Sequence, residues 1–282
     1  MRGLTTFNIG GPAEFVVSPE NAEQAMNIIL WAREHHVPIA YVGKGSDTLC
    51  SDGGVKGIVL HTAKMTKVTI STNGIITAEC GVGLPALAQA AARQGYSGLE
   101  WAAGIPGSVG GSVLMNAGAY GGEMSGVVDW VRVFDGQNII EIDDHDFDYR
   151  HSIYMENPEW LILEASFTLW ADSQDDIQAR MKQLAKERQK KQPVDIPSAG
   201  SFFKRPPKRF AGALIDGCGL KGYSIGGAQV SRKHAGFIVN ACSAECRDVM
   251  QLAEYVRQTV QRQTGVELTP EVHLLGDIQW NF

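Results

Sequence analysis

The chain has 282 residues, of which 44% are hydrophobic and 20% charged, a globular composition that excludes a disordered protein. Its formal net charge of −6 argues against a general nucleic-acid-binding protein, because such proteins carry a basic surface. The five cysteines form no Cys-x-x-Cys pair, which favours free thiols, largely buried, in a reducing compartment. Cys242 and Cys246 could lie one helical turn apart, but no nearby pair of ligands completes a zinc site with them. No apolar run reaches the length of a membrane span. We therefore expect a cytoplasmic protein without a metal, a membrane segment or a nucleic-acid partner.

Hydrophobic periodicity and turn residues predict an α+β fold. Residues 18–36 are expected to form a helix that Ser18 caps, with Pro19 at its first position. The Asn73-Gly74 pair predicts a hairpin between strands at 67–71 and 75–80, since this dipeptide favours a tight turn. The remaining predicted strands are 39–42, 57–60, 127–134, 138–142 and 160–170, and the remaining predicted helices are 84–94, 174–191 and a long one that Ser243 caps and Gly265 ends.

Glycine makes up 32 of the 282 residues, about 11% against a usual value of roughly 7%, and it gathers in two zones, 95–122 and 200–236. In the first zone, glycines beside Ser108 and Asn116 would let backbone N–H groups approach a phosphate closely, although tight turns are the alternative explanation. Two shorter loops, Asn8-Ile-Gly-Gly11 and Gly43-Lys-Gly-Ser-Asp47, have a similar composition. Together they predict a dinucleotide site. Neither the Walker nor the Rossmann spacing is present, so another dinucleotide architecture is expected.

The second zone contains Ser201 on a glycine turn, followed by Lys204 and Arg205. This places a hydroxyl group beside concentrated positive charge, although a serine that only shapes the turn is the alternative. No G-x-S-x-G elbow is present, so hydrolase chemistry is not supported.

Ten motifs that occur in order carry a family resemblance. They are Thr5-Thr-Phe-x-Ile-Gly-Gly-Pro-Ala13, Gly43-x-Gly-Ser46, Ala103-Gly-Ile-Pro-Gly-Ser-Val-Gly-Gly111, Met115-Asn-Ala-Gly-Ala-Tyr-Gly121, Tyr149-Arg-x-Ser152, Gly200-Ser-Phe-Phe-Lys-Arg-Pro206, Leu220-Lys-Gly222, Ile225-Gly-Gly-Ala228, His234-Ala-Gly-Phe-Ile-Val-Asn240 and Pro270-Glu-Val272. Over nearly its whole length the chain resembles the UDP-N-acetylenolpyruvoylglucosamine reductases, the MurB family, in their shorter subtype.

The resemblance implies a PCMH-type FAD-binding unit at 1–172, with subdomains at about 1–64 and 65–172. A C-terminal α+β substrate domain would follow at 173–282. It also implies a cytoplasmic, monomeric enzyme of peptidoglycan precursor synthesis. In that enzyme NADPH reduces bound FAD, and the flavin then reduces UDP-N-acetylenolpyruvoylglucosamine to UDP-N-acetylmuramate.

The same resemblance implies roles for individual residues. Arg150 would bind the substrate carboxylate as a fork, Glu271 would support the enolic oxygen, and Ser201 would donate a proton. The residues expected to bind the substrate are Lys204, Arg205, Lys221, His234 and His273. The residues expected to bind FAD are Gly43, Lys44, Gly45, Ser46, Asp47, Gly104, Ile105, Pro106, Gly107, Ser108, Gly110, Gly111, Asn116, Ala117 and Gly118.

Two residues depart from the family pattern. Asp47 stands where the family usually has Asn, and His273 stands where Arg is common. An ionised Asp accepts hydrogen bonds but cannot donate them, and it adds negative charge near a pyrophosphate. Two alternatives therefore stay open: a degenerate paralogue that binds flavin or a nucleotide sugar without turnover, and another PCMH-type flavin oxidoreductase, such as an alcohol or sugar oxidase.

Overall fold

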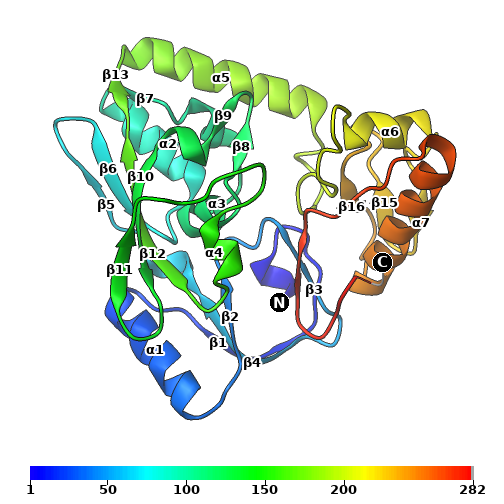
Figure 1. The fold of residues 1–282 in the computed structure, drawn as a ribbon. Coiled ribbons are helices and arrows are strands. Elements are labelled where there is room, and N and C mark those ends of the chain that lie inside the picture. The colour runs from blue at the N-terminus through cyan, green and yellow to red at the C-terminus, as the bar shows by residue number, and fades with distance from the viewer. Residues whose placement is uncertain (281–282) are drawn as a thin grey trace. The chain divides into compact units, whose positions relative to one another are not determined.

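The protein is described by a computed structural model that covers residues 1–280 and confirms the mixed helix and strand content (Figure 1). The helices are α1 (Ala22–Glu34), α2 (Leu84–Arg93), α3 (Val109–Leu114), α4 (Ile153–Glu156), α5 (Gln174–Lys191), α6 (Ala211–Gly217) and α7 (Cys246–Thr264), with short 3-10 turns η1 (Arg2–Leu4), η2 (Thr62–Lys64), η3 (Glu100–Gly104) and η4 (Met124–Gly126). The strands are β1 (Ala13–Val17), β2 (Ile39–Val42), β3 (Thr48–Cys50), β4 (Val55–His61), β5 (Val68–Ile70), β6 (Ile75–Glu79), β7 (Tyr96–Ser97), β8 (Gly118–Ala119), β9 (Gly122–Glu123), β10 (Val128–Phe134), β11 (Ile139–Ile142), β12 (Leu161–Thr168), β13 (Trp170–Ala171), β14 (Ser224–Ile225), β15 (Ala228–Val230), β16 (Ile238–Asn240) and β17 (His273–Leu275).

Contacts within the chain divide it into two compact units. Unit 1 contains residues 1–15 and 45–57 together with the chain from Gln189 onward, and unit 2 contains Val16–Lys44 and Ile58–Arg188. One reason that an N-terminal segment belongs to unit 1 is the parallel pairing of β3 with β17, in which Thr48 lies opposite His273. This division differs from the expected boundary at 172/173, and the functional domain boundaries stay a prediction.

The central feature of unit 2 is a five-stranded antiparallel sheet in the order β11-β10-β12-β6-β5. Most side chains of β12 are buried on both faces of the sheet, which places this strand in the middle of the core. The predicted hairpin is confirmed, because β5 pairs with β6 and Gly74 adopts the left-handed conformation (φ +84°) that a tight turn needs. The hairpin is visible at the left of Figure 1.

The start of α1 corrects one prediction. The helix begins at Ala22 rather than near Ser18, and the side chain of Asn21 accepts a hydrogen bond from the Gln24 N–H group at 2.9 Å. The Ser18 hydroxyl lies instead 3.5 Å from Nδ1 of His61. Ser, Asn and Pro are all common at helix starts, so local sequence alone could not distinguish between these caps. The predicted helix at 174–191 is confirmed as α5.

Unit 1 contains the three-stranded sheet β14-β15-β16 and the helices α6 and α7 around its own hydrophobic core. The long helix α7 begins at Cys246 with Glu245 as its N-cap, so the prediction that Ser243 caps it is wrong. Ser243 has a left-handed backbone (φ +48°), which an N-cap residue does not adopt. The predicted end is confirmed, because Gly265 forms a left-handed C-cap (φ +71°).

All five cysteines are free thiols. Cys50, Cys80 and Cys246 are buried, as expected, whereas Cys242 is exposed, which corrects the expectation of burial for that residue. Burial raises the pKa of the Cys80 thiol to about 12, so this group stays protonated and unreactive near neutral pH. Within residues 1–280, no helix is long and apolar enough to cross a membrane.

Candidate functional site

Three glycine-containing segments that are far apart in the sequence meet within unit 2. The N–H group of Leu84 donates to the carbonyl oxygen of Gly107 at 2.9 Å, and the N–H group of Val109 donates to Val82 at 2.8 Å. These bonds join the start of α2 to the turn before α3. Gly43 reaches the same turn, because a Cβ atom on Gly43 would lie 2.1 Å from the Ser108 hydroxyl oxygen.

This close approach tests whether the glycine loops fit a dinucleotide. A Cβ atom on Gly43 would overlap Ser108, so the position accepts glycine and keeps the backbone open to a ligand. Lys44 lies nearby, since its Cε atom is 3.7 Å from the point where a Cβ atom on Gly83 would lie. Backbone N–H groups and one lysine are the donors that a pyrophosphate requires. The residues therefore fit a phosphate-containing cofactor, and Gly83 is a member of this loop cluster that the sequence analysis missed, although a Gly81-Val-Gly83 motif marks it.

His61 is a second neighbour of this loop cluster that the sequence did not reveal. It ends β4, and its Cα atom is paired with that of Val42 in the parallel ladder with β2. Burial lowers the pKa of His61, a hydrogen bond with the Gly43 backbone opposes that shift, and the Lys44 charge adds to it. A lone histidine in a strand carries no spacing signal, so it could not have been singled out from the sequence.

The other predicted FAD-binding residues are distributed between the two units. Gly104, Ile105, Pro106, Gly110, Gly111, Ala117 and Gly118 lie in unit 2, and Gly45, Ser46 and Asp47 lie in unit 1. The guanidinium of Arg188 donates to the Gly104 carbonyl oxygen and lies 5.9 Å from the centre of the Tyr120 ring. Arg188 could not be singled out from the sequence because it lies in a charged helical run, where a solvent-exposed position is the ordinary expectation.

Arg150 is held by the loop that contains Asn116. Its Nη1 and Nη2 atoms donate to the carbonyl oxygens of Asn116 and Gly118 at 3.4 and 3.3 Å. The Asn116 side chain is buried, and its Nδ2 atom donates to the Asp148 carbonyl oxygen at 3.0 Å while its Oδ1 atom accepts from the Ser125 N–H group at 3.0 Å. The Asn116 side chain thus connects the backbone just before Arg150 with the loop that contains Ser125. Its predicted contact with FAD stays a prediction.

Ser201 and Glu271 come from segments that run beside each other in unit 1. The Glu271 N–H group donates to the Phe202 carbonyl oxygen at 2.9 Å, and Phe203 forms an antiparallel bridge with Pro270. Phe202 in turn donates its N–H group to Gly236 at 2.8 Å, in the segment that follows His234. Ser201 itself is exposed, as a group that must reach a substrate has to be.

Two lysine–histidine pairs lie among the predicted substrate residues of unit 1. Burial lowers the pKa of His273, and the positive charge of Lys204 adds to this effect. Burial and the charge of Lys221 likewise lower the pKa of His234. Both imidazoles are therefore predominantly neutral at neutral pH, and the positive charge is carried by the lysines. Arg205 lies 5.1 Å from the centre of the Phe210 ring.

Two family models that match this chain define the class of protein to which it belongs. Residues 13–141 match the family model of an FAD-binding domain, and residues 192–275 match the C-terminal domain of UDP-N-acetylenolpyruvoylglucosamine reductase. The chain is thus a flavoprotein with an FAD-binding part followed by a reductase-type C-terminal part.

Full-length relatives identify the family. The chain is 42% identical over 280 residues to UDP-N-acetylenolpyruvoylglucosamine reductase of Caldanaerobacter subterraneus subsp. tengcongensis, covering 98% of this chain and 92% of that protein. It is also 42% identical to the reductase of Pediococcus pentosaceus, covering 97% and 91%. The crystal structure of the MurB reductase from Thermus caldophilus has a TM-score of 0.80 and 34% identity, covering 97% of this chain and 96% of that chain. The chain belongs to the UDP-N-acetylenolpyruvoylglucosamine reductase family.

Proposed function

We propose that this protein reduces UDP-N-acetylenolpyruvoylglucosamine to UDP-N-acetylmuramate with NADPH as reductant and FAD as its bound cofactor. Membership of the reductase family over nearly the whole chain supports the reaction. The observation that carries the residue assignments is the backbone pairing that sets Ser201 beside Glu271 in unit 1. The location in the cytoplasm stays an expectation from the sequence.

The chemistry explains why a serine and a carboxyl group are needed together. Bound FAD supplies hydride transfer from NADPH to the enolpyruvyl double bond. The addition leaves enolate character next to the substrate carboxylate, which requires hydrogen-bond donors on the oxygens and a proton donor at the adjacent carbon. Ser201 donates that proton, and Glu271 supports the enolic oxygen.

The positive charge that binds anionic groups of the substrate comes from lysine side chains rather than from histidine side chains. Lys204 and Lys221 lie beside His273 and His234, whose pKa values are lowered, so the lysines bind anionic groups while the neutral imidazoles donate or accept single hydrogen bonds. His273 therefore does not replace the charge of the arginine that is common at its position. Arg150 binds the carboxylate with two parallel N–H groups, a geometry that lysine cannot reproduce.

Replacement of Ser201 by alanine tests this proposal by separating the two half-reactions. We expect Ser201→Ala to leave reduction of the flavin by NADPH unchanged and to slow re-oxidation by the enolpyruvyl substrate by roughly 10²–10⁴-fold, as is typical of losing a positioned acid. Ser201→Cys should recover part of the rate, because a thiol also donates a proton. Stopped-flow absorbance of the flavin measures both steps. Unchanged re-oxidation in Ser201→Ala would contradict the role of Ser201.

The same preparation distinguishes the remaining alternatives. A purified protein with flavin absorption and NADPH consumption that depends on the enolpyruvyl substrate supports the proposed reaction. Flavin reduction without any response to that substrate indicates a different flavin oxidoreductase. A colourless protein that takes up no added FAD indicates a degenerate paralogue.

A further inference from the structure

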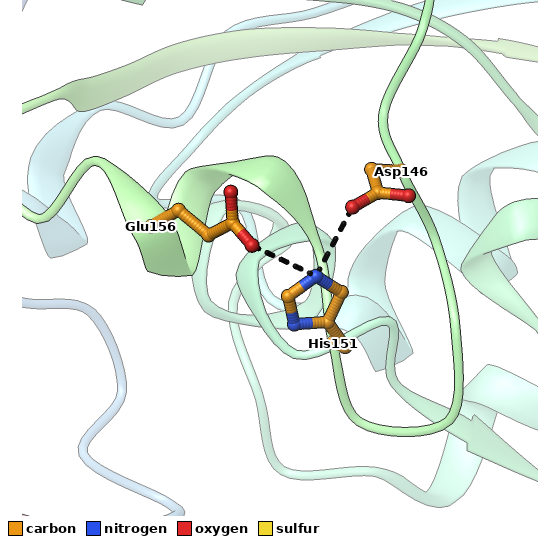
Figure 2. Close-up of side chains that lie close together, drawn as sticks. All are labelled: Asp146, His151 and Glu156. Atoms are coloured by element: carbon orange, nitrogen blue, oxygen red, sulfur yellow. Dashed lines mark hydrogen bonds and ion pairs between the residues drawn. The ribbon is translucent and has the colours of Figure 1, made fainter.

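Three side chains of unit 2 converge on one point beside the loop that carries Arg150 (Figure 2). The Nε2 atom of His151 lies 3.2 Å from Oδ2 of Asp146 and 3.5 Å from Oε1 of Glu156. One ligand atom from each residue lies within 4.8 Å of the other two. The sequence predicts no metal ligands, and these residues are ten positions apart at most, with no spacing that marks them as a set.

The arrangement brings two anionic groups to one nitrogen atom. Nε2 carries at most one proton, so it can donate a hydrogen bond to one carboxylate at a time. A cation at the common point would contact all three atoms and remove the repulsion between the two carboxylates. Ligand atoms that share a tetrahedral zinc ion at about 2.1 Å lie about 3.4 Å apart. The two nitrogen–oxygen distances in this cluster match that spacing.

The backbone holds these side chains in position by hydrogen bonds that do not involve the side chains themselves. Asp148 and His151 exchange two backbone hydrogen bonds, at 3.3 and 3.1 Å, which close the turn between these two residues and lie within the segment that joins Asp146 to His151. The next residue, Ser152, donates its hydroxyl to the Leu114 carbonyl oxygen at 2.6 Å and is fully buried. The first residue of α4, Ile153, donates its N–H group to the His145 carbonyl oxygen at 2.9 Å, and Glu156 is the last residue of this short helix. A site that is already ordered binds an ion at a lower entropic cost.

Local charge also favours a cation. The segment 141–148 contains the acidic residues Glu141, Asp143, Asp144, Asp146 and Asp148. Such a concentration of carboxylates creates a negative potential that attracts divalent ions to the loop.

We propose that Asp146, His151 and Glu156 bind a divalent cation of the zinc class, with water completing the coordination. An imidazole with two carboxylates suits Zn²⁺, whereas Mg²⁺ and Ca²⁺ prefer sites made of oxygen ligands alone. The bound ion links residues 146 and 156 and closes a ring of chain that contains Arg150. An ordering effect of the ion on Arg150 in substrate binding rests on the proposed function. The binding of the ion to the three side chains does not.

Calorimetric titration of the FAD-loaded protein with zinc chloride tests the site. Cys242 is exposed and is a competing thiol ligand, so the titration uses the Cys242→Ser background. We expect one equivalent of zinc to bind, and His151→Gln or Glu156→Gln to weaken binding by on the order of tenfold or more. The control His35→Gln changes an exposed histidine that directly follows α1 and should leave the affinity unchanged. Magnesium chloride should give no comparable binding.

Two results would overturn the proposal. The first is the absence of zinc binding at millimolar concentration, and the second is an affinity that neither His151→Gln nor Glu156→Gln reduces. Hydrogen exchange locates the ion independently of any variant that folds poorly. Zinc should slow amide exchange within residues 147–155 of the unsubstituted loop, and binding without this protection would assign the ion to another site. Because both measurements use no substrate, failure of the proposed reduction would leave them unaffected.

Discussion

Asn116 illustrates, at the scale of single residues, how a position that resembles a cofactor contact can have a structural role. Its buried side chain connects Asp148 with Ser125, and its carbonyl oxygen accepts from Arg150. Asn116 also has a left-handed backbone (φ +40°), which asparagine tolerates better than most residues. We therefore regard Asn116 as a positioning residue for Arg150.

Asn116→Gly tests this role, because glycine keeps the left-handed backbone while removing both side-chain hydrogen bonds. We expect KM for the enolpyruvyl substrate to rise by about tenfold, corresponding to about 1.4 kcal/mol, with the flavin content unchanged. Steady-state kinetics and the flavin-to-protein absorbance ratio measure the two quantities. Asn157→Ala, which removes a side-chain hydrogen bond elsewhere in unit 2, is the matched control. Loss of flavin with KM unchanged would instead support the FAD contact predicted from the sequence.

Gly43 leads to a prediction about the cofactor. An added Cβ atom would lie 2.1 Å from the Ser108 hydroxyl oxygen and 3.2 Å from the Ser108 Cβ atom, so in Gly43→Ala the hydroxyl must move and the turn before α3 must give way slightly. We expect FAD to bind at least about tenfold more weakly, since a turn shifted by a few tenths of an ångström loses hydrogen bonds to phosphate. Titration of the apoprotein with FAD, followed by fluorescence quenching, measures the affinity.

The control for this substitution is Gly126→Ala, where a Cβ atom would meet nothing within 4 Å. It should retain FAD like the unsubstituted protein. Equal affinities for Gly43→Ala and Gly126→Ala would show that the Gly43 turn does not contact the cofactor.

At the scale of elements, the start of α7 depends on a residue distant in sequence. The Asp52 carboxylate accepts hydrogen bonds from the N–H groups of Cys246 and Arg247 at 2.7 and 3.1 Å. The first N–H groups of a helix lack partners within the helix, and a negative charge there also interacts favourably with the helix dipole. This tertiary contact adds to the capping box formed by Glu245 and Asp248.

Asp52→Ala should therefore lower the free energy of unfolding by about 1 kcal/mol. This value is smaller than for a buried carboxylate, because Asp52 is exposed and solvent screens its charge. Ser243→Asn is the matched control, because Ser243 was the cap expected from the sequence and asparagine tolerates its left-handed backbone. Urea unfolding of the two variants compares them. A larger loss in Ser243→Asn than in Asp52→Ala would reverse the assignment of the cap.

The helix α5 is connected to η3 by an ion pair whose strength depends on pH. Arg180 donates to Glu100 at 2.8 Å, and Ser97 and the Gly98 N–H group also donate to the Glu100 carboxylate. Burial alone would raise the pKa of Glu100, but hydrogen bonds from Gly98, Ser97 and Arg180 outweigh it and lower the pKa. A lowered folded-state pKa means that the ionised form stabilises the fold.

This stabilisation is fully present above the unfolded-state pKa of about 4.3 and is lost as the pH falls through the lower folded-state pKa. Glu100→Gln should cost about 1 kcal/mol of unfolding free energy near neutral pH, and the difference should disappear in acid. Denaturant titrations at a series of pH values measure it. Glu20→Gln serves as the control, because Glu20 pairs with Lys64 on the surface. This substitution should change the free energy of unfolding only slightly. A difference for Glu100→Gln that grows as the pH falls would contradict the assignment.

At the scale of the whole molecule, the candidate site residues are divided between the two compact units. Arg150 and the loop cluster around Gly43 and Ser108 belong to unit 2, whereas Ser201 and Glu271 belong to unit 1. The family relationship spans both units, since the relatives match almost the full chain. Each unit thus contains part of the residue set that the family resemblance implies.

The amino-acid sequence alone determined the elements whose signals are local. The Asn73-Gly74 hairpin, the end of α7 at Gly265 and the extent of α5 follow from turn residues and hydrophobic period, which act within a few residues. The ordered motifs also determined the family, because ten short patterns in one order are far more specific than any one of them.

The tertiary structure decided what depends on contacts between distant segments. The sequence contained several acceptable caps for α1 and α7, and the choice between them followed from the backbone conformation at Asn21 and Ser243. The neutral state of His273 follows from burial next to Lys204, and the meeting of Asp146, His151 and Glu156 follows from a turn. Burial, charge and distance in space are properties of the folded chain, so neither residue type nor spacing could have specified them.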